Sequence, residues 1–224
     1  KRRKMARPAG VFDADGKFCV DAMTWRSSRR PTTVEPDLPP ETEVDREVAG
    51  TMLYAGLSYG HFGHALCESL ARLWAVDEFK DPIDAVAFIP KNAITWPERS
   101  LGMVQLISDQ LGDMPRLTAF NKPTRVERLV IAPQAFGVND LMSGSPEFRA
   151  FTDRRLRQRI KPAGPDKIYI SRSELFRKRG RFLFEDYIEA KMEAEGYTIF
   201  HPQQHDLATQ LSYYKGASMI VSTD

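Results

Sequence analysis

Apolar and polar residues follow one another along the chain in blocks that predict strands and helices in alternation. Met52 to Leu57 is a short apolar run typical of a buried strand. From His64 to Phe79, apolar side chains recur every three or four residues, which is the period of an amphipathic helix. A strand at Ala85 to Ile89 and a helix at Glu98 to Leu111 continue the order. The pattern therefore predicts an α/β fold.

Further elements complete this first half of the chain. The pattern predicts strands near Leu117 and at Arg125 to Ala132, and then a basic helix from Glu147 to Ile160. Ahead of the first strand, Val11 to Met23 is typical of a hairpin turning at Asp15-Gly16. The proline-rich stretch Ser27 to Glu47 predicts an extended loop.

The last third of the chain has the most regular pattern, β-α-β-α-β. The expected elements are strands at Lys167–Ser171, Tyr197–Phe200 and Ser218–Ser222 and helices at Phe184–Glu195 and Leu207–Lys215. Such an order predicts a parallel sheet like one half of a Rossmann domain. Because the last strand ends next to Asp224, we expect a nucleotide-binding lobe that is incomplete in this chain.

Proline and glycine in the stretch Lys161 to Pro165 predict the main domain boundary. We expect an N-terminal hairpin and linker at 1–50, an α/β lobe at 51–161, and the first half of a second lobe at 166–224.

Composition narrows the class of protein. Among 224 residues, 32 Lys and Arg balance 30 Asp and Glu, so no large single-sign field favours nucleic acid. No apolar run reaches the roughly 18 residues of a membrane-spanning helix. Two distant cysteines, Cys19 and Cys67, form no zinc framework. We expect a cytoplasmic protein, either free or peripheral to the inner membrane.

A first polar cluster lies on the predicted helix that begins at His64. His64, Glu68 and Arg72 are four residues apart, which places them on one stripe of a helix. An imidazole beside a carboxylate suits a general base. The alternative is an exposed helix face with an ion pair between Glu68 and Arg72. His61, His64 and Glu68 are also residue types that bind zinc, so a metal site is a further interpretation. Their spacing differs, however, from that of the zinc-binding motif in hydrolases.

A second cluster is basic and follows the predicted strand that ends at Ser171. Its members are Arg172, Arg177, Lys178, Arg179 and Arg181. Loops at the carboxyl ends of parallel strands line ligand sites. One guanidinium group can donate two hydrogen bonds to phosphate oxygens, so a diphosphate is the expected ligand. The alternatives are a solvated loop, or a nucleic-acid surface shared with the basic run Arg154 to Arg159.

Two motifs resemble glycosyltransferase family 61, which includes capsular polysaccharide biosynthesis proteins and xylosyl- and N-acetylglucosaminyltransferases. His61 to Trp74 is similar to a motif that reads Asn-Tyr-Tyr-His-Trp, with a Glu four residues after the His and then Arg-Leu. Ser171-Arg172, with Arg181 and Glu185 later, is similar to Ser-Arg followed by Arg-x-x-Asn-Glu.

The remainder of the resemblance lies in the last part of the chain. Gly196-Tyr197, Gln210 and the strand Ala217 to Val221 fit the family's later elements. The chain departs from the family's pattern at three positions, which are His61 in place of Asn, Ala65 in place of Trp and Phe184 in place of Asn.

The resemblance implies an inverting glycosyltransferase of GT-B type, with two Rossmann-like lobes. It would transfer a sugar from a nucleotide-sugar donor, expected to be a UDP-sugar, to a hydroxyl of a glycan acceptor, with no metal or other cofactor and no nucleic-acid partner. His64 would be the base and Glu68 would orient it, while His61 and Arg72 would line the acceptor side.

The implied donor site lies in the second lobe. Three arginines would hold the diphosphate, namely Arg172, Arg177 and Arg181. Glu185 would pair with one of these arginines or bind a ribose hydroxyl. Two alternatives from other classes stay open, an inactive scaffold that keeps the transferase fold and a basic α/β module that binds nucleic acid.

Overall fold

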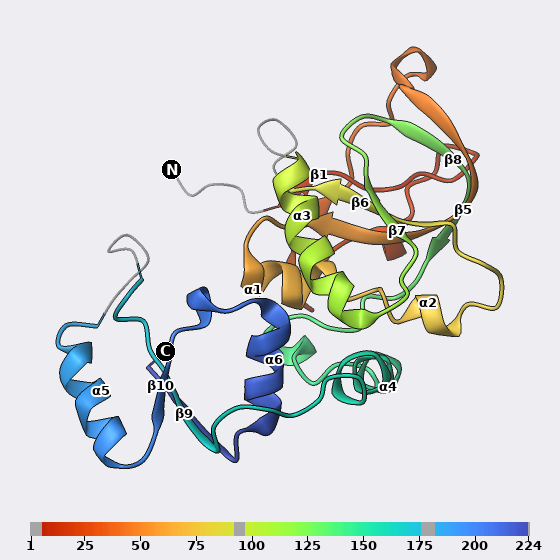
Figure 1. Cartoon of the computed structure of the whole chain (residues 1–224). Coiled ribbons are helices and arrows are strands. Elements are labelled where there is room, and N and C mark those ends of the chain that lie inside the picture. The colour runs from red at the N-terminus through yellow and green to blue at the C-terminus, as the bar shows by residue number, and fades with distance from the viewer. Residues whose placement is uncertain (1–5, 92–96, 176–181, 224) are drawn as a thin grey trace. The chain divides into compact units, whose positions relative to one another are not determined.

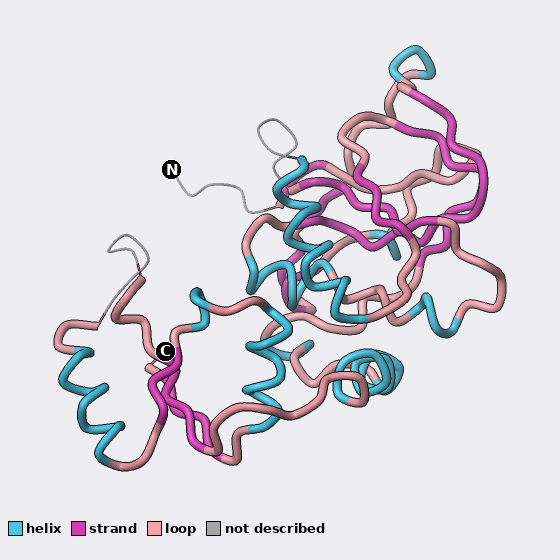
Figure 2. Tube along the Cα trace, in the orientation of Figure 1, coloured by secondary structure: helices cyan, strands magenta, loops and turns pink. Residues whose placement is uncertain are grey.

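The chain forms two compact units. The computed structural model describes residues 6–91, 97–175 and 182–223. Lys1–Asp153 make up the N-terminal unit and Arg154–Asp224 the C-terminal unit. Figure 1 labels their helices and strands, and Figure 2 colours each unit's strands apart from its helices and loops.

A four-stranded parallel sheet organises the N-terminal unit. Its strands are β5 (Arg46–Ser58), β6 (Ala85–Pro90), β7 (Arg116–Ala119) and β8 (Thr124–Ile131). They lie side by side in the order β7-β6-β5-β8, and every neighbouring pair is parallel. This is the order of the first four strands in a doubly wound α/β sheet. The predicted α/β class is thereby confirmed.

Strand β5 is the centre of this core. From Met52 to Ser58 every residue is buried, as expected for a parallel strand covered on both faces. On one face Met52 packs with Ala85 and Ala87, while on the other Leu53 packs with Ala75 and Ala132. The predicted strand is correct in place, and it is longer than its apolar run because its first residues pair with β8.

One long helix, α3 (Pro97–Ser108), contacts β5, β6 and β7 and lies across the sheet (Figure 1). A 3-10 turn, η4 (Asp109–Leu111), ends it.

Further along, the predicted basic helix is shorter than expected. Helix α4 (Pro146–Thr152) starts at the cap Ser145, whose hydroxyl accepts a hydrogen bond from the Phe148 N–H, and the chain then passes into a π-helical turn, η6 (Asp153–Arg157).

The residues before β5 form short pieces of structure. The predicted hairpin near Asp15-Gly16 is reduced to a single antiparallel bridge between Phe12 and Phe18. The predicted loop contains two-residue strands, because prolines limit pairing. The pieces are β1 (Arg7–Pro8), η1 (Val20–Ala22), β2 (Trp25–Ser27), β3 (Arg30–Pro31), β4 (Thr33–Val34) and η2 (Glu41–Glu43), with β1 paired to β4 and β2 to β3.

The C-terminal unit has the predicted β-α-β-α-β order. Its elements are β9 (Lys167–Ile170), α5 (Glu185–Ala194), β10 (Thr198–Phe200), η8 (Pro202–Gln204), α6 (Leu207–Gly216) and β11 (Met219–Ser222). Both β10 and β11 pair parallel with β9, in the order β10-β9-β11. The sequence order therefore reverses its direction in the sheet between β9 and β11.

Local signals explain why this unit was predictable. Gly196 ends α5 at a φ of 81°, a left-handed conformation that favours glycine. Asp206 caps α6 by accepting a hydrogen bond from the Thr209 N–H at 2.7 Å. At the start of α5, by contrast, Phe184 has a φ of 61° and makes no side-chain cap.

The predicted single helix from His64 to Phe79 is wrong as a regular helix. The chain forms one short turn, α1 (Phe62–His64), then a π-helical stretch, η3 (Ala65–Ser69), and after a further turn α2 (Ala75–Glu78). A π-helix advances by less than 100° per residue, so the apolar and polar stripes drift. Leu66 is exposed as a result, and both Glu68 and Arg72 are buried.

Arg72 is buried because its guanidinium binds three backbone carbonyls. Its Nε donates to Ala132 O at 2.8 Å, just beyond β8. Its Nη2 donates to Asp21 O at 3.0 Å and to Met23 O at 2.7 Å. Gly56, with no Cβ, allows this approach, because a Cβ there would lie 3.1 Å from Nη1. One side chain thus fastens the N-terminal segment to the sheet.

We predict that Arg72→Lys destabilises the N-terminal unit by about 3 kcal/mol or more, because an ammonium cannot reach all three carbonyls and leaves buried acceptors unpaired. Arg128→Lys is the control, since Arg128 is about half exposed and pairs with Asp81 at 2.8 Å. It should cost less than about 1 kcal/mol. Urea unfolding midpoints measure both, and equal midpoints for the two variants would contradict the role of Arg72.

We also predict that Phe184→Asn stabilises the C-terminal unit by about 1 kcal/mol. Asparagine tolerates the left-handed conformation, caps helices, and is the residue that the resembled motif has at this position. Phe184→Ala is the matched control, because it also removes the exposed ring but supplies no cap. Thermal unfolding should rank Asn above Ala, and the opposite ranking would show that the cap contributes nothing.

Candidate functional site

The first group of candidate residues follows the carboxyl end of β5. In the order β7-β6-β5-β8, the strand sequence changes direction between β5 and β8. Ligands in open α/β sheets bind outside the carboxyl ends of the strands at such a point. The chain leaves β5 at Ser58 and passes through Tyr59 and His61 into α1 and η3, which carry His64 and Glu68.

His64 and Glu68 form a hydrogen-bonded pair. Nδ1 of His64 lies 2.6 Å from Oε1 of Glu68. The Glu68 side chain is only 1% exposed, whereas that of His64 is 35% exposed. Because an ionised carboxylate can only accept a hydrogen bond, a neutral His64 paired with it carries its proton on Nδ1 and leaves Nε2 as the nitrogen that can accept a proton. The sequence prediction that these two residues come together is confirmed by this contact.

Two further residues lie beside the pair, Arg26 next to Glu68 and Tyr59 next to His64. Nε of Arg26, on β2, lies 3.8 Å from Oε1 of Glu68. The ring of Tyr59 stacks on His64 with centroids 5.2 Å apart and planes at 23°. Burial, and secondly the charge of Glu68, raise the pKa of Tyr59 far above its usual value, so its hydroxyl stays protonated at neutral pH. His64 therefore has a fixed ring beside a charged, buried carboxylate.

Arg72 does not join this group. The sequence places it on one stripe with His64 and Glu68, but the π-helical turn and the three carbonyls direct its guanidinium elsewhere. Burial lowers the pKa of Arg72, and the Tyr54 ring lies beneath the guanidinium at 5.8 Å. The side chain is 1% exposed, so its place is in the interior and not on an acceptor surface.

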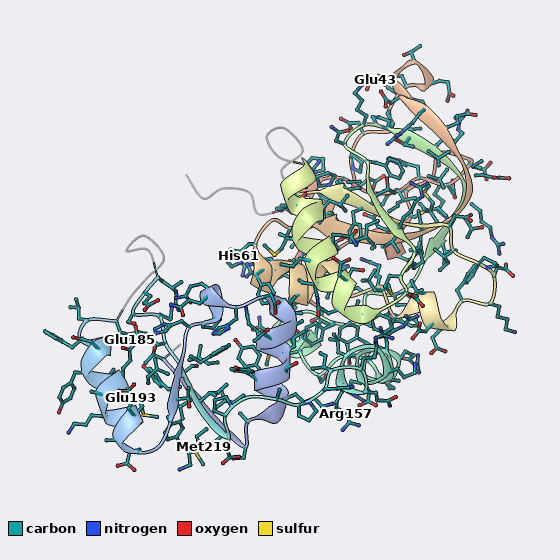
Figure 3. All side chains as sticks on the ribbon, viewed as in Figure 1. Glu43, His61, Arg157, Glu185, Glu193 and Met219 are labelled. Carbon is teal, nitrogen blue, oxygen red and sulfur yellow. The ribbon has the colours of Figure 1, made fainter. Side chains whose placement is uncertain are left out.

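His61 lies at the rim of the group. It is exposed (Figure 3). Its ring meets that of His64 edge-on, with centroids 5.5 Å apart. The apolar side chains of Phe62 and Leu66, which are 40% and 38% exposed, lie on the same short helical segment. The segment that carries His64 therefore also presents aromatic and apolar surface.

The second group lies where β9 and β11 end in the C-terminal unit. Glu185, at the start of α5, is 2% exposed (Figure 3). Its Oε1 accepts a hydrogen bond from the Arg172 N–H at 2.9 Å and another from the Thr223 hydroxyl at 3.2 Å. Its Oε2 is buried with no hydrogen-bond partner among the described residues. Glu185 thus joins the two strands at the switch point.

One turn further along α5, Glu189 accepts hydrogen bonds from the hydroxyls of Ser171 and Ser173. Glu185 therefore holds the backbone of the loop after β9 and Glu189 holds two of its side chains, and Arg172 lies half-buried in this loop. The predicted phosphate-binding residues Arg177 and Arg181 lie outside the described residues.

The described residues contain neither a cluster of metal ligands nor a membrane-spanning helix. Over residues 6–91, 97–175 and 182–223, no three His, Cys, Asp or Glu side chains are grouped so that they could hold a metal ion. In the same ranges, no helix has both the length and the apolar character to cross a bilayer.

Sequence reasoning missed Arg26 and Tyr59. Arg26 lies in a segment with no regular period, far from Glu68 along the chain, so no spacing rule could connect them. Tyr59 directly follows a buried strand and precedes His61, and that position at the carboxyl end of a parallel strand was a usable signal.

Comparison with known proteins places the chain in a family. Residues 62–224 match the family described as Glycosyltransferase 61. No curated protein and no solved structure matched. The matched range, more than half of the chain, includes His64, Glu68, Arg172 and Glu185, and it begins after Arg26. The chain therefore belongs to glycosyltransferase family 61 and is a glycosyltransferase.

Proposed function

We propose that the protein inverts the anomeric centre of a nucleotide-sugar, expected to be a UDP-sugar, as it transfers the sugar to a hydroxyl of a glycan acceptor. The observation that carries this proposal is the hydrogen bond of 2.6 Å between Nδ1 of His64 and the buried carboxylate of Glu68. A histidine held in this way is built to remove a proton.

The proposed chemistry is a single displacement. The acceptor hydroxyl oxygen attacks the anomeric carbon, and the bond from that carbon to the diphosphate oxygen breaks with its electron pair leaving on the diphosphate. The hydroxyl proton passes to Nε2 of His64. Glu68 stabilises the imidazolium that forms, because its charge lies against Nδ1. Because the oxygen attacks the face of the anomeric carbon opposite the leaving group, the configuration at that carbon is inverted.

The acceptor surface would be formed by groups beside the imidazole. His61 is exposed next to His64, and Phe62 and Leu66 present apolar surface on the same segment. Aromatic rings and aliphatic side chains pack against the C–H faces of sugars, while an imidazole binds their hydroxyls. These properties support a glycan as the acceptor.

The donor would be held by the C-terminal unit, the second of two Rossmann-like lobes in the proposed GT-B arrangement. Arg172 lies beyond β9 at the switch point, where a guanidinium could bind diphosphate oxygens. Glu185 has a buried Oε2 without a partner in the described part of the chain, and a ribose hydroxyl would satisfy it. Arg177 and Arg181 would add positive charge against the leaving diphosphate.

We predict that His64→Gln in the full-length protein lowers kcat/KM for transfer by about 10²- to 10⁴-fold, the usual loss when a general base is removed. UDP binding should remain intact, because the base acts on the acceptor and not on the diphosphate. Transfer assays with a UDP-sugar and calorimetric titration of UDP measure the two effects. Unchanged turnover would remove His64 from the reaction.

We predict that Arg172→Lys weakens UDP binding, since an ammonium cannot reproduce a planar contact of two hydrogen bonds. Arg159→Lys, an exposed arginine of the same unit, is the control and should bind as the wild type does. Bound UDP at a hundredfold excess over Kd stabilises the fold by about 2.7 kcal/mol, so the shift in Tm reports binding. A full shift in Arg172→Lys would mean that this residue supplies only diffuse charge.

A further inference from the structure

A residue that lies before the family-matched region completes the catalytic pair. The match begins at residue 62, whereas Nε of Arg26 lies 3.8 Å from the Glu68 oxygen that also binds His64. We propose that Arg26 is a positioning residue for the base, which keeps Glu68 ionised while His64 is neutral. This inference rests on the proposed role of His64.

The need for such a residue follows from the burial of Glu68. A buried carboxylate without a compensating charge takes up a proton, either on itself or on a neighbouring base. Glu68 is 1% exposed, so solvent cannot compensate its charge. If the proton went to His64, Nε2 would no longer be basic towards an acceptor. Arg26 supplies a charge that cannot be lost by deprotonation at ordinary pH.

The backbone on both sides of Arg26 is fixed. The Trp25 N–H donates to Oε1 of Gln134 at 2.8 Å, and Nε2 of Gln134 donates back to Trp25 O at 2.6 Å. The Val138 N–H donates to Arg26 O at 2.9 Å. Gln134 and Val138 belong to the segment after β8, so Arg26 is held by the other side of the same switch point. Its position is set by the fold and not by a flexible turn.

Among the residues that the structure describes, Tyr59, His61, Cys67 and Lys91 are further titratable groups near the pair, and the charge of Glu68 acts on Lys91. The rings of Tyr59 and His61 face His64, and Nζ of Lys91 lies 5.9 Å from the Tyr59 ring centroid. Burial, and after it the charge of Glu68, raise the pKa of both Tyr59 and Cys67, while the charge of Arg26 acts on both in the opposite direction.

The test is the titration of His64 in the full chain, followed by two-dimensional NMR of its imidazole and assigned with the His64→Gln variant. Removing a positive charge stabilises the imidazolium, so Arg26→Gln should raise the midpoint by about one pH unit or more. Arg26→Lys keeps the charge and should restore a midpoint near that of the wild type. The acid limb of kcat/KM should move upward in Arg26→Gln and return in Arg26→Lys.

Arg29→Gln is the matched control, because it removes one exposed positive charge from the same β2–β3 turn. It should leave the His64 midpoint unchanged. An unchanged midpoint in Arg26→Gln, or an equal rise in Arg29→Gln, would overturn the inference. Arg26→Met, which keeps the apolar stem, replaces the Gln variant if that variant does not fold. Retained turnover in His64→Gln would instead overturn the proposed function, so the two failures are distinguishable.

Discussion

The buried guanidinium of Arg72 is the contact that ties the N-terminal segment to the sheet from which the proposed catalytic pair projects. Buried away from water, it needs acceptors for its donors, and Nε and Nη2 find them in Ala132 just beyond β8 and in Asp21 and Met23 of the N-terminal segment, while Nη1 has no hydrogen-bond partner among the described residues. That segment then runs directly into β2, where Arg26 reaches Glu68. The position of the positive charge beside the dyad thus follows from satisfying three backbone carbonyls.

The same constraint explains where sequence reasoning succeeded and where it failed. Periodicity and turn signals act over a few residues, so they predicted the strands and helices of the C-terminal unit, where the structure has Gly196 at the end of α5 and Asp206 as the cap of α6. They also predicted the contact of His64 with Glu68, since four residues separate them. The local pattern could not show that Glu68 and Arg72 are buried, because their partners are distant in the sequence. Only the fold brings Arg26 and Ala132 to them.

Leu66 and Arg72 show how one irregular helical turn reverses the expected burial of two side chains. A regular helix would have buried Leu66 with Leu70 and Leu73 and left Arg72 on the polar face. Leu66, in the π-helical turn, is instead 38% exposed, and Arg72, three residues after the turn, is 1% exposed. π-helical turns are often found at functional sites, and this one lies between His64, whose side chain is one-third exposed, and the buried Arg72.

The two units use a buried glutamate in the same place for different chemistry. Glu68 and Glu185 each lie on the helical segment that follows the first strand of a parallel sheet, and each is at most 2% exposed. Glu68 is bonded to an imidazole, a group that changes protonation near neutral pH, so its unit is suited to moving a proton. Glu185 is bonded to the Arg172 N–H and the Thr223 hydroxyl, neither of which titrates in that range. Its unit is suited to binding without proton transfer. The difference in partners, rather than in the carboxylates themselves, is the physical reason for assigning the base to the N-terminal unit and the nucleotide to the C-terminal unit.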